Sequence, residues 1–195
     1  MKLYYAPGAC SLADHIALIA AGIDHSTEKV DLKVKTTESG KDYRTINPKG
    51  YVPALELDDG QILTENIAVL LYIAHSAHKL LPDGFARWRV IETIAYISTE
   101  VHKSFKPLFD PNAENDAKGS AKQLIRQRLD YLEGLLGGRP FIVGDRMTIA
   151  DCYLFVMLCW CRRCDIPLPK QLLAYFHLME IEPAVAAAMT KEGLR

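Results

Sequence analysis

Strand patterns in this chain end before its midpoint, and that change constrains the fold more than any single motif. The linker at residues 79–85 contains Pro82 and Gly84, which interrupt regular structure. Strand and helix patterns alternate before the linker, and only helical periodicity remains after it. We therefore expect an α/β domain over residues 1–78 and an all-α helical domain over residues 86–195.

The individual elements are expected from apolar periodicity and turn residues. In the first domain we expect strands at residues 2–5, 27–32, 52–57 and 61–63, helices at 11–22 and 67–77, and a polar loop at 33–43 followed by one helical turn. In the second domain we expect helices at residues 86–105, 117–136, 149–164, 171–179 and 183–189, with core spacing for Trp88, Tyr96, Phe105 and Trp160.

Composition excludes several classes of protein. The chain has 195 residues, and its 49% hydrophobic and 24% charged content favours a sizeable core over general disorder. A net charge of −1 without a long basic run argues against nucleic acid or an anionic membrane as the main partner. Five cysteines without regular spacing indicate a reducing compartment, and no secretory signal pattern is visible. We therefore expect a cytoplasmic protein.

The first strand leads into a turn and a cysteine. Pro7-Gly8 ends the strand, and Cys10 stands where a helix begins. Ser11 followed by Asp14 has the pattern of a capping box, which predicts a helix start at Ser11. The positive end of a helix stabilises a thiolate. This stretch alone leaves a reactive and an inert cysteine equally open.

Val52-Pro53 is a second unusual pair. Proline cannot donate to a strand ladder, so Pro53 is expected at a sheet edge or a strand start. A cis bond would leave the Val52 backbone free to pair with an extended peptide. Spacing alone favours an ordinary trans bond, because only about 5–6% of such bonds are cis.

Five motifs occur in order along the chain: Lys2–Leu12, Asn47–Leu55, Leu63–Asn66, Thr99–Lys103 and Thr148–Asp151. With these motifs the chain resembles a cytosolic glutathione transferase of the bacterial beta class over essentially its whole length. The resemblance implies a thioredoxin-like first domain that binds glutathione and a helical second domain that closes the electrophile site. It also implies a homodimer.

The resemblance implies a position for each part of glutathione. Glu65 would take the ammonium group, and the backbone N–H of Asn66 would take the γ-glutamyl carboxylate. Val52, before a cis Pro53, would pair with the cysteinyl backbone. Lys35 would reach the glycyl carboxylate. Plain helix capping by Glu65 and Asn66, and a solvated Lys35, are the alternatives.

Cys10 and His102 are the expected catalytic residues, since the resemblance places His102 opposite the thiol site. Lowering a thiol pKa by two units needs about 2.7 kcal/mol, whereas a helix dipole gives roughly 0.3–1 kcal/mol. A donor such as His102, the Cys10 thiol or Ser11 must therefore also face the sulfur. Thr99 is expected to bind glutathione, and further candidates are Tyr5, Ser11, Tyr51, Glu100, Lys103 and Phe105.

The function implied is a detoxifying transferase that conjugates glutathione to small hydrophobic electrophiles. Two alternatives stay open: a thiol–disulfide reductase or dehalogenase acting through Cys10, and a non-enzymatic protein-binding module. Tyr51 stands where the family has Gln, and Asn66 where Ser is commoner. We expect no metal, because Cys161 and Cys164 have C-x-x-C spacing but lack a second ligand pair.

Overall fold

The computed structural model describes residues 1–195, which divide into two compact units. Unit 1 contains Met1–Leu81 together with Ile181–Arg195, and unit 2 contains Pro82–Glu180. The expected helical domain extended to residue 195, whereas the last helix is grouped here with the sheet. Its packing on the first helix is the physical reason for this difference.

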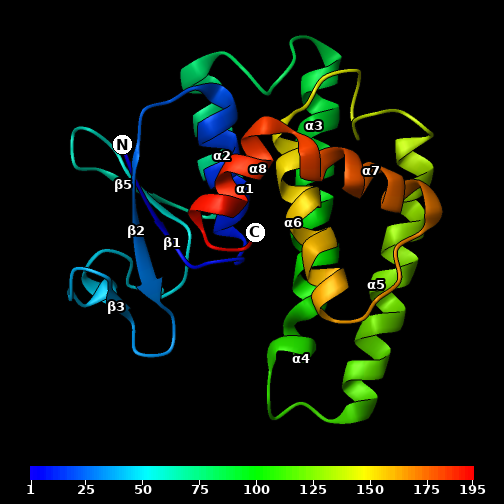
Figure 1. Ribbon diagram of the computed structural model, residues 1–195, viewed down its shortest axis with the longest axis horizontal. Helices are drawn as coiled ribbons and strands as arrows, with labels where there is room; N and C mark the ends of the chain where they lie inside the picture. The colour runs from blue at the N-terminus through cyan, green and yellow to red at the C-terminus, as the bar shows by residue number, and fades with distance from the viewer. The chain divides into compact units, whose positions relative to one another are not determined.

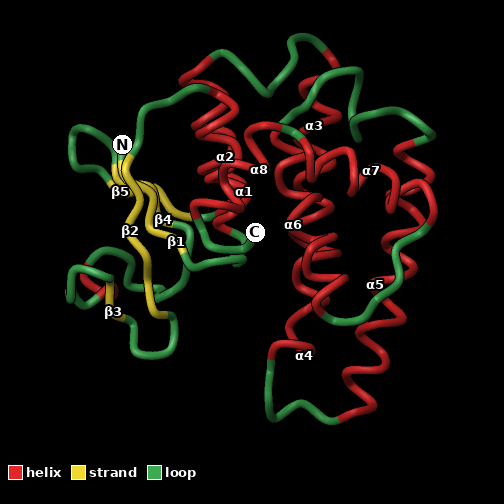
Figure 2. Tube along the Cα trace, viewed as in Figure 1, coloured by secondary structure: helices red, strands yellow, loops and turns green.

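A mixed five-stranded sheet forms the centre of unit 1 (Figure 2). Its spatial order is β3-β2-β1-β4-β5, with bounds Thr36–Thr37, Ser26–Asp31, Lys2–Tyr5, Ala54–Glu56 and Ile62–Thr64. β1 runs parallel to β2, with Leu3 opposite Thr27, and antiparallel to β4, with Leu3 opposite Leu55. The thioredoxin-like α/β fold expected for this part is confirmed.

Three helices of unit 1 lie on the same side of this sheet (Figure 1). They are α1 (Ser11–Ala21), α2 (Asn66–Ala77) and α8 (Pro183–Lys191). α1 packs against both α2 and α8. It ends at Gly22, whose positive φ of 73° suits glycine at a helix C-terminus.

The segment expected as a polar loop contains an additional short strand, β3. Thr37 pairs with Val30 of β2, and the 3-10 turn η1 (Tyr43–Thr45) follows. A strand of two threonines is too short to show apolar alternation, so periodicity could not indicate it.

Unit 2 is helical. The single regular helix expected over residues 86–105 is instead broken into several elements. Its elements are α3 (Phe85–Tyr96), the π-helical turn η2 (Ile97–Val101), the 3-10 turn η3 (His102–Phe105), α4 (Lys106–Phe109), α5 (Asn115–Leu136), α6 (Ile149–Arg163) and α7 (Lys170–Ile181). The Thr99 hydroxyl donates to the Ala95 carbonyl at 3.1 Å, and this bond competes for the carbonyl that a regular helix uses. The departure from α geometry begins at Ile97, and the π turn ends immediately before His102. Such π turns occur often at functional sites.

α6 forms the core of unit 2, since its residues from Ile149 to Leu158 are all buried. The capping box expected at its start is confirmed: Thr148 accepts from the Ala150 N–H, and Asp151 accepts from the Thr148 N–H. These bonds satisfy donors that the helix start leaves without intrahelical partners.

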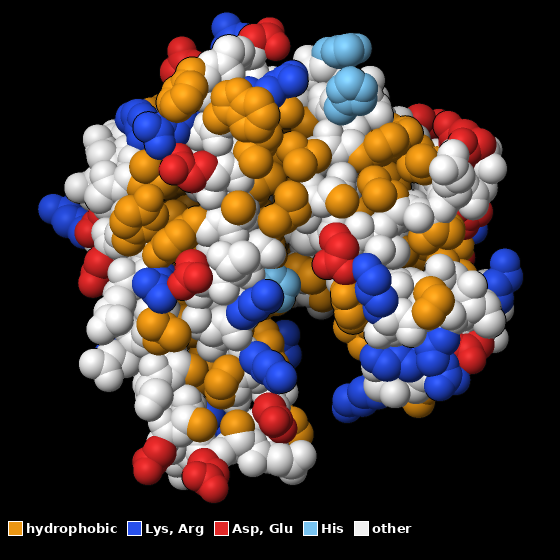
Figure 3. Space-filling view, turned by 180° about the vertical axis from the view of Figure 1, so that it is seen from behind, with side chains coloured by type: hydrophobic (Ala, Val, Ile, Leu, Met, Phe, Trp, Pro, Cys, Tyr) orange, Lys and Arg blue, Asp and Glu red, His pale blue; other side chains and the backbone are white.

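Hydrophobic side chains reach the surface in several places on the face drawn in Figure 3. The expectation of a core position for Trp88 is wrong, because 61% of it is exposed, and Phe85 on the same helix is 70% exposed. No single helix is both long and apolar enough to cross a bilayer. Only α7 and α8 counted together have the length and apolar composition of a membrane span, and a bend separates them.

Candidate functional site

Cys10 stands at the start of α1, and its Sγ donates to the Val52 carbonyl at 3.4 Å. The Val52–Pro53 bond is cis. The trans bond favoured by spacing is therefore wrong, and the cis bond implied by the family resemblance is present. Cys10 thus faces the backbone at the point where the chain enters β4.

The capping box expected at Ser11 does not form. Cys10 occupies the N-cap position with helical backbone angles, and no side chain caps the helix. The Ser11 hydroxyl instead bonds back to the Ala6 backbone, accepting from its N–H at 3.3 Å. Asp14 is fully buried on α1.

Burial raises the pKa of the Cys10 thiol to about 12, and the nearby Asp14 acts in the same direction. Backbone N–H groups at the helix start lower this pKa but do not outweigh burial. The stretch alone left a reactive and an inert cysteine open, and this raised pKa favours a protonated thiol over a thiolate in the protein without a ligand. At neutral pH Cys10 is a neutral thiol that can donate a hydrogen bond.

Asn66 connects the start of α2 to this thiol. With its amide oriented so that each atom faces a compatible partner, the nitrogen donates to Asp14 Oδ2 and to the Cys10 carbonyl, both at 3.0 Å. Burial raises the pKa of Asp14 well above its usual value. The capping role expected for the Asn66 side chain is therefore wrong, and the side chain holds the first turn of α1 instead.

An exposed charged cluster lies at the N-cap of α2. Glu65 has a positive φ of 75° and makes no side-chain capping bond, so the capping expected of it is also wrong. Its carboxylate accepts from the Tyr51 hydroxyl at 2.8 Å and forms a close ion pair with Lys49. The carboxylate raises the pKa of Lys49. This cluster offers charges of both signs to a ligand.

Lys35 lies nearby in unit 1, with its Nζ donating to the Gly50 carbonyl at 2.7 Å. Tyr5 is half-buried and packs against the His15 ring at a centroid distance of 5.8 Å. This placement agrees with packing as the main role of Tyr5.

The turn before Cys10 is held by the far end of the chain. Glu192, at the end of α8, accepts from the Gly8 N–H at 3.0 Å and bonds His15 Nδ1 at 3.0 Å. The side chains of Glu192 and His15 are 0% and 1% exposed. A buried charge of this kind is stable only when it is paired and hydrogen-bonded. Sequence patterns gave no indication of this contact.

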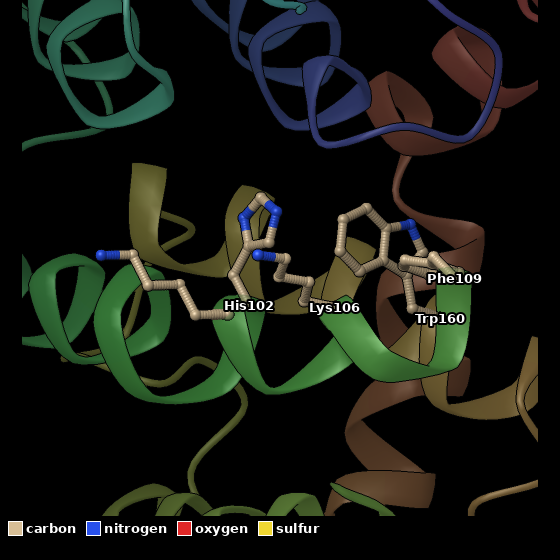
Figure 4. Close-up of a pocket in the computed structure, with 5 residues that line it drawn as sticks. His102, Lys106, Phe109 and Trp160 are labelled. Atoms are coloured by element: carbon tan, nitrogen blue, oxygen red, sulfur yellow. The ribbon is translucent and has the colours of Figure 1, made fainter. Parts of the chain in front are cut away.

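A pocket of about 400 Å³ opens in unit 2 (Figure 4). It is lined by His102, Lys103, Lys106, Phe109 and Trp160. Figure 4 shows the side chains of His102 and Lys106 rising from the same side of their segment, with the Trp160 ring next to Phe109. The Trp160 ring meets His102 and Phe109 edge to face at 4.8 and 4.9 Å.

His102 is held by Tyr153 of α6, whose hydroxyl lies 2.6 Å from Nδ1. Burial lowers the pKa of His102 to about 4, and Lys103 acts in the same direction. The imidazole is therefore neutral at pH 7. When the Tyr153 hydroxyl donates to Nδ1, the ring carries its proton on Nε2 and can donate it to an anion.

The other residues expected in unit 2 have structural partners. Glu100 pairs with Arg128 at 2.7 Å, and the Thr99 hydroxyl is bonded to Ala95. Phe105 is fully buried and contacts Trp160 at 5.3 Å, so it lies behind the lining rather than on it.

Four cysteines lie on α6 or at its end. Cys152 and Cys161 are buried, Cys159 and the helix-terminal Cys164 are half-buried, and none of them forms a disulfide. No group of three or more His, Cys, Asp or Glu side chains is arranged to hold a metal ion.

Sequence reasoning missed Lys106, Phe109 and Tyr153. The core position expected for Trp160 is confirmed, since only 7% of it is exposed, and the same side chain also lines the pocket. The spacing of His102 and Lys106 by four residues indicates a shared helix face. Tyr153 carried no comparable signal, because it lies within the uniformly apolar sequence of α6.

Two family models match this chain. The glutathione S-transferase N-terminal domain matches residues 9–76, and the glutathione S-transferase C-terminal domain matches residues 100–184.

Similar proteins share the full length of the chain. Glutathione S-transferase GstA of Escherichia coli O157:H7 is 42% identical over 201 residues, covering 100% of both chains. A sphingomonad glutathione S-transferase solved in complex with glutathione is 43% identical, with a TM-score of 0.94 and 100% of both chains covered. A bacterial beta-class glutathione S-transferase from Sphingomonas chungbukensis is 41% identical, with a TM-score of 0.92 and the same coverage.

Proposed function

Because this chain belongs to the glutathione S-transferase family, we propose a role for each unit in its transferase reaction. Unit 1 binds glutathione around Cys10 and the cis Val52–Pro53 bond. The pocket that contains His102 receives the electrophile. The observation that supports this assignment best is the neutral Cys10 thiol at the helix start, directed at the backbone that precedes β4.

Glutathione is an extended tripeptide with an ammonium group at one end, and we assign its groups to the cluster at α2. Glu65 binds the ammonium, and the Asn66 N–H at the positive end of α2 binds the γ-glutamyl carboxylate. Val52 pairs with the cysteinyl backbone, and Lys35 binds the glycyl carboxylate. Thr99 is a further proposed contact, and Tyr51 supports Glu65 through their 2.8 Å hydrogen bond.

The proposed chemistry is stabilisation of the glutathione thiolate by donors. The Cys10 thiol exchanges its bond to the Val52 carbonyl for one to the glutathione sulfur. His102 donates a second bond from Nε2. Charge-assisted hydrogen bonds of this kind contribute about 1.5–3 kcal/mol each, which exceeds the helix-dipole term. The stabilised thiolate then attacks the electrophilic carbon.

The protonated state of Cys10 distinguishes conjugation from disulfide chemistry. Thiol–disulfide exchange needs a thiolate as the attacking group. The raised pKa leaves Cys10 a poor nucleophile but a usable donor. The raised pKa of Cys10 therefore favours glutathione conjugation over disulfide reduction through Cys10.

Two alanine variants test the catalytic assignment. Cys10→Ala and His102→Ala are compared with the parent chain in glutathione binding and in conjugation to an aryl halide. We expect both variants to raise the pKa of the bound glutathione thiol, measured by thiolate absorbance, and to lower kcat/KM at neutral pH. Unchanged turnover and unchanged glutathione affinity in both variants would show the assignment to be wrong.

We also propose a cytoplasmic homodimer that removes small electrophiles. Five cysteines without a disulfide are consistent with a reducing compartment. The exposed Phe85 and Trp88 on α3 offer apolar surface for a second copy. Light scattering of the parent chain and of Trp88→Glu tests the dimer; a parent monomer at micromolar concentration would contradict it.

A further inference from the structure

The pocket of unit 2 has an aromatic wall. The rings of Phe109 and Trp160 meet edge to face at 4.9 Å, and Phe109 is 44% exposed. Aromatic surfaces favour an aromatic ligand, through stacked or edge-to-face contact. A volume of about 400 Å³ lies within the range of small-molecule sites.

Cations surround this wall. The exposed Lys103 and Lys106 line the pocket, and the Arg163 guanidinium lies 5.9 Å from the centre of the Phe109 ring. None of these three groups has a carboxylate within 4.0 Å. His102 is neutral at pH 7, so these side chains supply the positive charge.

The carboxylates close to the pocket, in sequence or in structure, already bind other groups. Glu100 pairs with Arg128, Asp110 accepts from the Asn112 N–H at 2.9 Å, and Glu180 pairs with Arg162. None of these carboxylates forms an ion pair with Lys103, Lys106 or Arg163, so the three cations are available to an anionic ligand.

We propose that this pocket selects aromatic electrophiles that carry a carboxylate or a similar anionic group, which Lys106 binds. The inference rests on the proposed function, since it names the electrophile class for that reaction. With an aryl chloride, the glutathione thiolate attacks the ring carbon that bears chlorine. The C–S bond forms, chloride leaves with the electron pair of the C–Cl bond, and the thiol proton passes to solvent.

Two substrates of matched shape separate charge from size. 4-Chloro-3-nitrobenzoate carries a carboxylate, and 4-chloro-3-nitrobenzamide carries a neutral carboxamide in the same position. Each kcat/KM is divided by the uncatalysed rate constant with glutathione, which removes their difference in intrinsic reactivity. We expect the parent enzyme to prefer the benzoate, and added salt to weaken that preference.

Lys106→Gln removes the charge. We expect it to lower kcat/KM for the benzoate about fivefold, mainly through KM, because a partly exposed ion pair has this magnitude. The benzamide should change less than about twofold, since it makes no ion pair. Lys106→Arg should restore the preference, and Lys170→Gln, at an exposed lysine of the same unit, should leave both substrates unchanged.

Equal losses for both substrates would overturn the inference, and a raised KM for glutathione would then assign Lys106 to glutathione instead. If neither substrate reacts, the proposed function fails. Anion selection by the pocket is then tested by ligand binding, which does not depend on catalysis. In a Trp88→Phe background, the remaining Trp160 fluorescence should be quenched by 4-nitrobenzoate at lower concentration than by 4-nitrobenzamide. Equal quenching curves would contradict anion selection.

Discussion

Two helix starts in this molecule share one sequence pattern and fold differently. Ser11 precedes Asp14 by three residues, as Thr148 precedes Asp151, and each aspartate is fully buried in the first turn of its helix. At α6 the pattern is a complete capping box, whereas at α1 neither side chain caps the helix. The same short motif therefore serves folding in one unit and the proposed site in the other.

The backbone before each helix explains the difference. Thr148 is extended, with φ of −125° and ψ of 173°, so its side chain can turn back to the helix. Cys10 already has helical angles, and turn bonds such as Ala9 N–H to the Ala6 carbonyl precede it. Ser11 is therefore inside the helix, where its hydroxyl cannot cap.

The two aspartates also differ in how many donors surround them. Asp151 accepts from the Ile142 N–H, the Thr148 N–H and hydroxyl, and the Tyr175 hydroxyl, at 2.8 to 2.9 Å. Burial raises its pKa to about 6, against the opposing effect of these donors. Asp14 has one oxygen without a partner, and burial raises its pKa well above its usual value. The four donors around Asp151 favour its charged form, whereas the incomplete set around Asp14 favours the neutral acid.

Asp151→Asn should have the largest effect. The amide places an N–H among groups that donate, and it leaves buried donors without an acceptor. We expect a loss of about 3 kcal/mol in the free energy of unfolding, measured in urea at pH 7. Asp145→Asn, at an exposed position, is the control. A loss no greater than that of the control would remove the distinction between the two aspartates.

Tyr175→Phe should have a smaller effect. It removes one of the donors to Asp151 and leaves the others in place. We expect a loss of about 1 kcal/mol in the free energy of unfolding and a higher pKa for Asp151. In the Asp151→Asn background the same substitution should cost less, because the charged acceptor is gone. Simple additivity of the two losses would contradict this account.

Asp14→Asn should be milder still, at less than about 1 kcal/mol at pH 7, because the raised pKa favours a neutral acid and the amide is neutral too. Its pH dependence has a definite sign. A raised folded pKa stabilises the parent protein at low pH, and this stabilisation is lost as pH rises above the unfolded value of 3.8. The stability of Asp14→Asn relative to the parent should therefore improve between pH 4 and pH 7. The opposite trend would mean that Asp14 is ionised.

The smallest expected effect of Asp14→Asn is on the reactivity of Cys10. If Asp14 is neutral at pH 7, the substitution removes no negative charge from beside the thiol. We expect the rate of Cys10 alkylation by iodoacetamide to change less than about twofold. The comparison is made in a Cys159→Ser, Cys164→Ser background, in which the half-buried cysteines of α6 are absent. A marked acceleration would show that Asp14 is charged.

Much of the fold could be predicted from periodicity, because most strands and helices present an apolar pattern to a core. The sheet hairpin, α5 and the Thr148–Asp151 cap were expected close to where they occur. The break at η2 could not be predicted, because Thr99 is compatible with a regular helix until its hydroxyl competes for a backbone carbonyl.

The candidate site was predictable where a local signal exists and not where partners are distant in sequence. The family motifs indicated Cys10, the cis Pro53 and Glu65, but no local signal reveals that Asn66 bonds Asp14 or that Tyr153 bonds His102. The protonation of Cys10 was also out of reach, because the desolvation that decides it comes from the packed fold rather than from the helix start.

The buried Glu192 links folding to the order in which the chain is synthesised. Gly8 and His15 leave the ribosome early, but the carboxylate that they bind is made after all of unit 2. At usual elongation rates of about 5–20 residues per second, roughly 5–20 s separate Leu81 from Ile181. During that interval the face of α1 that α8 covers is open, so the unit that is translated first is completed last.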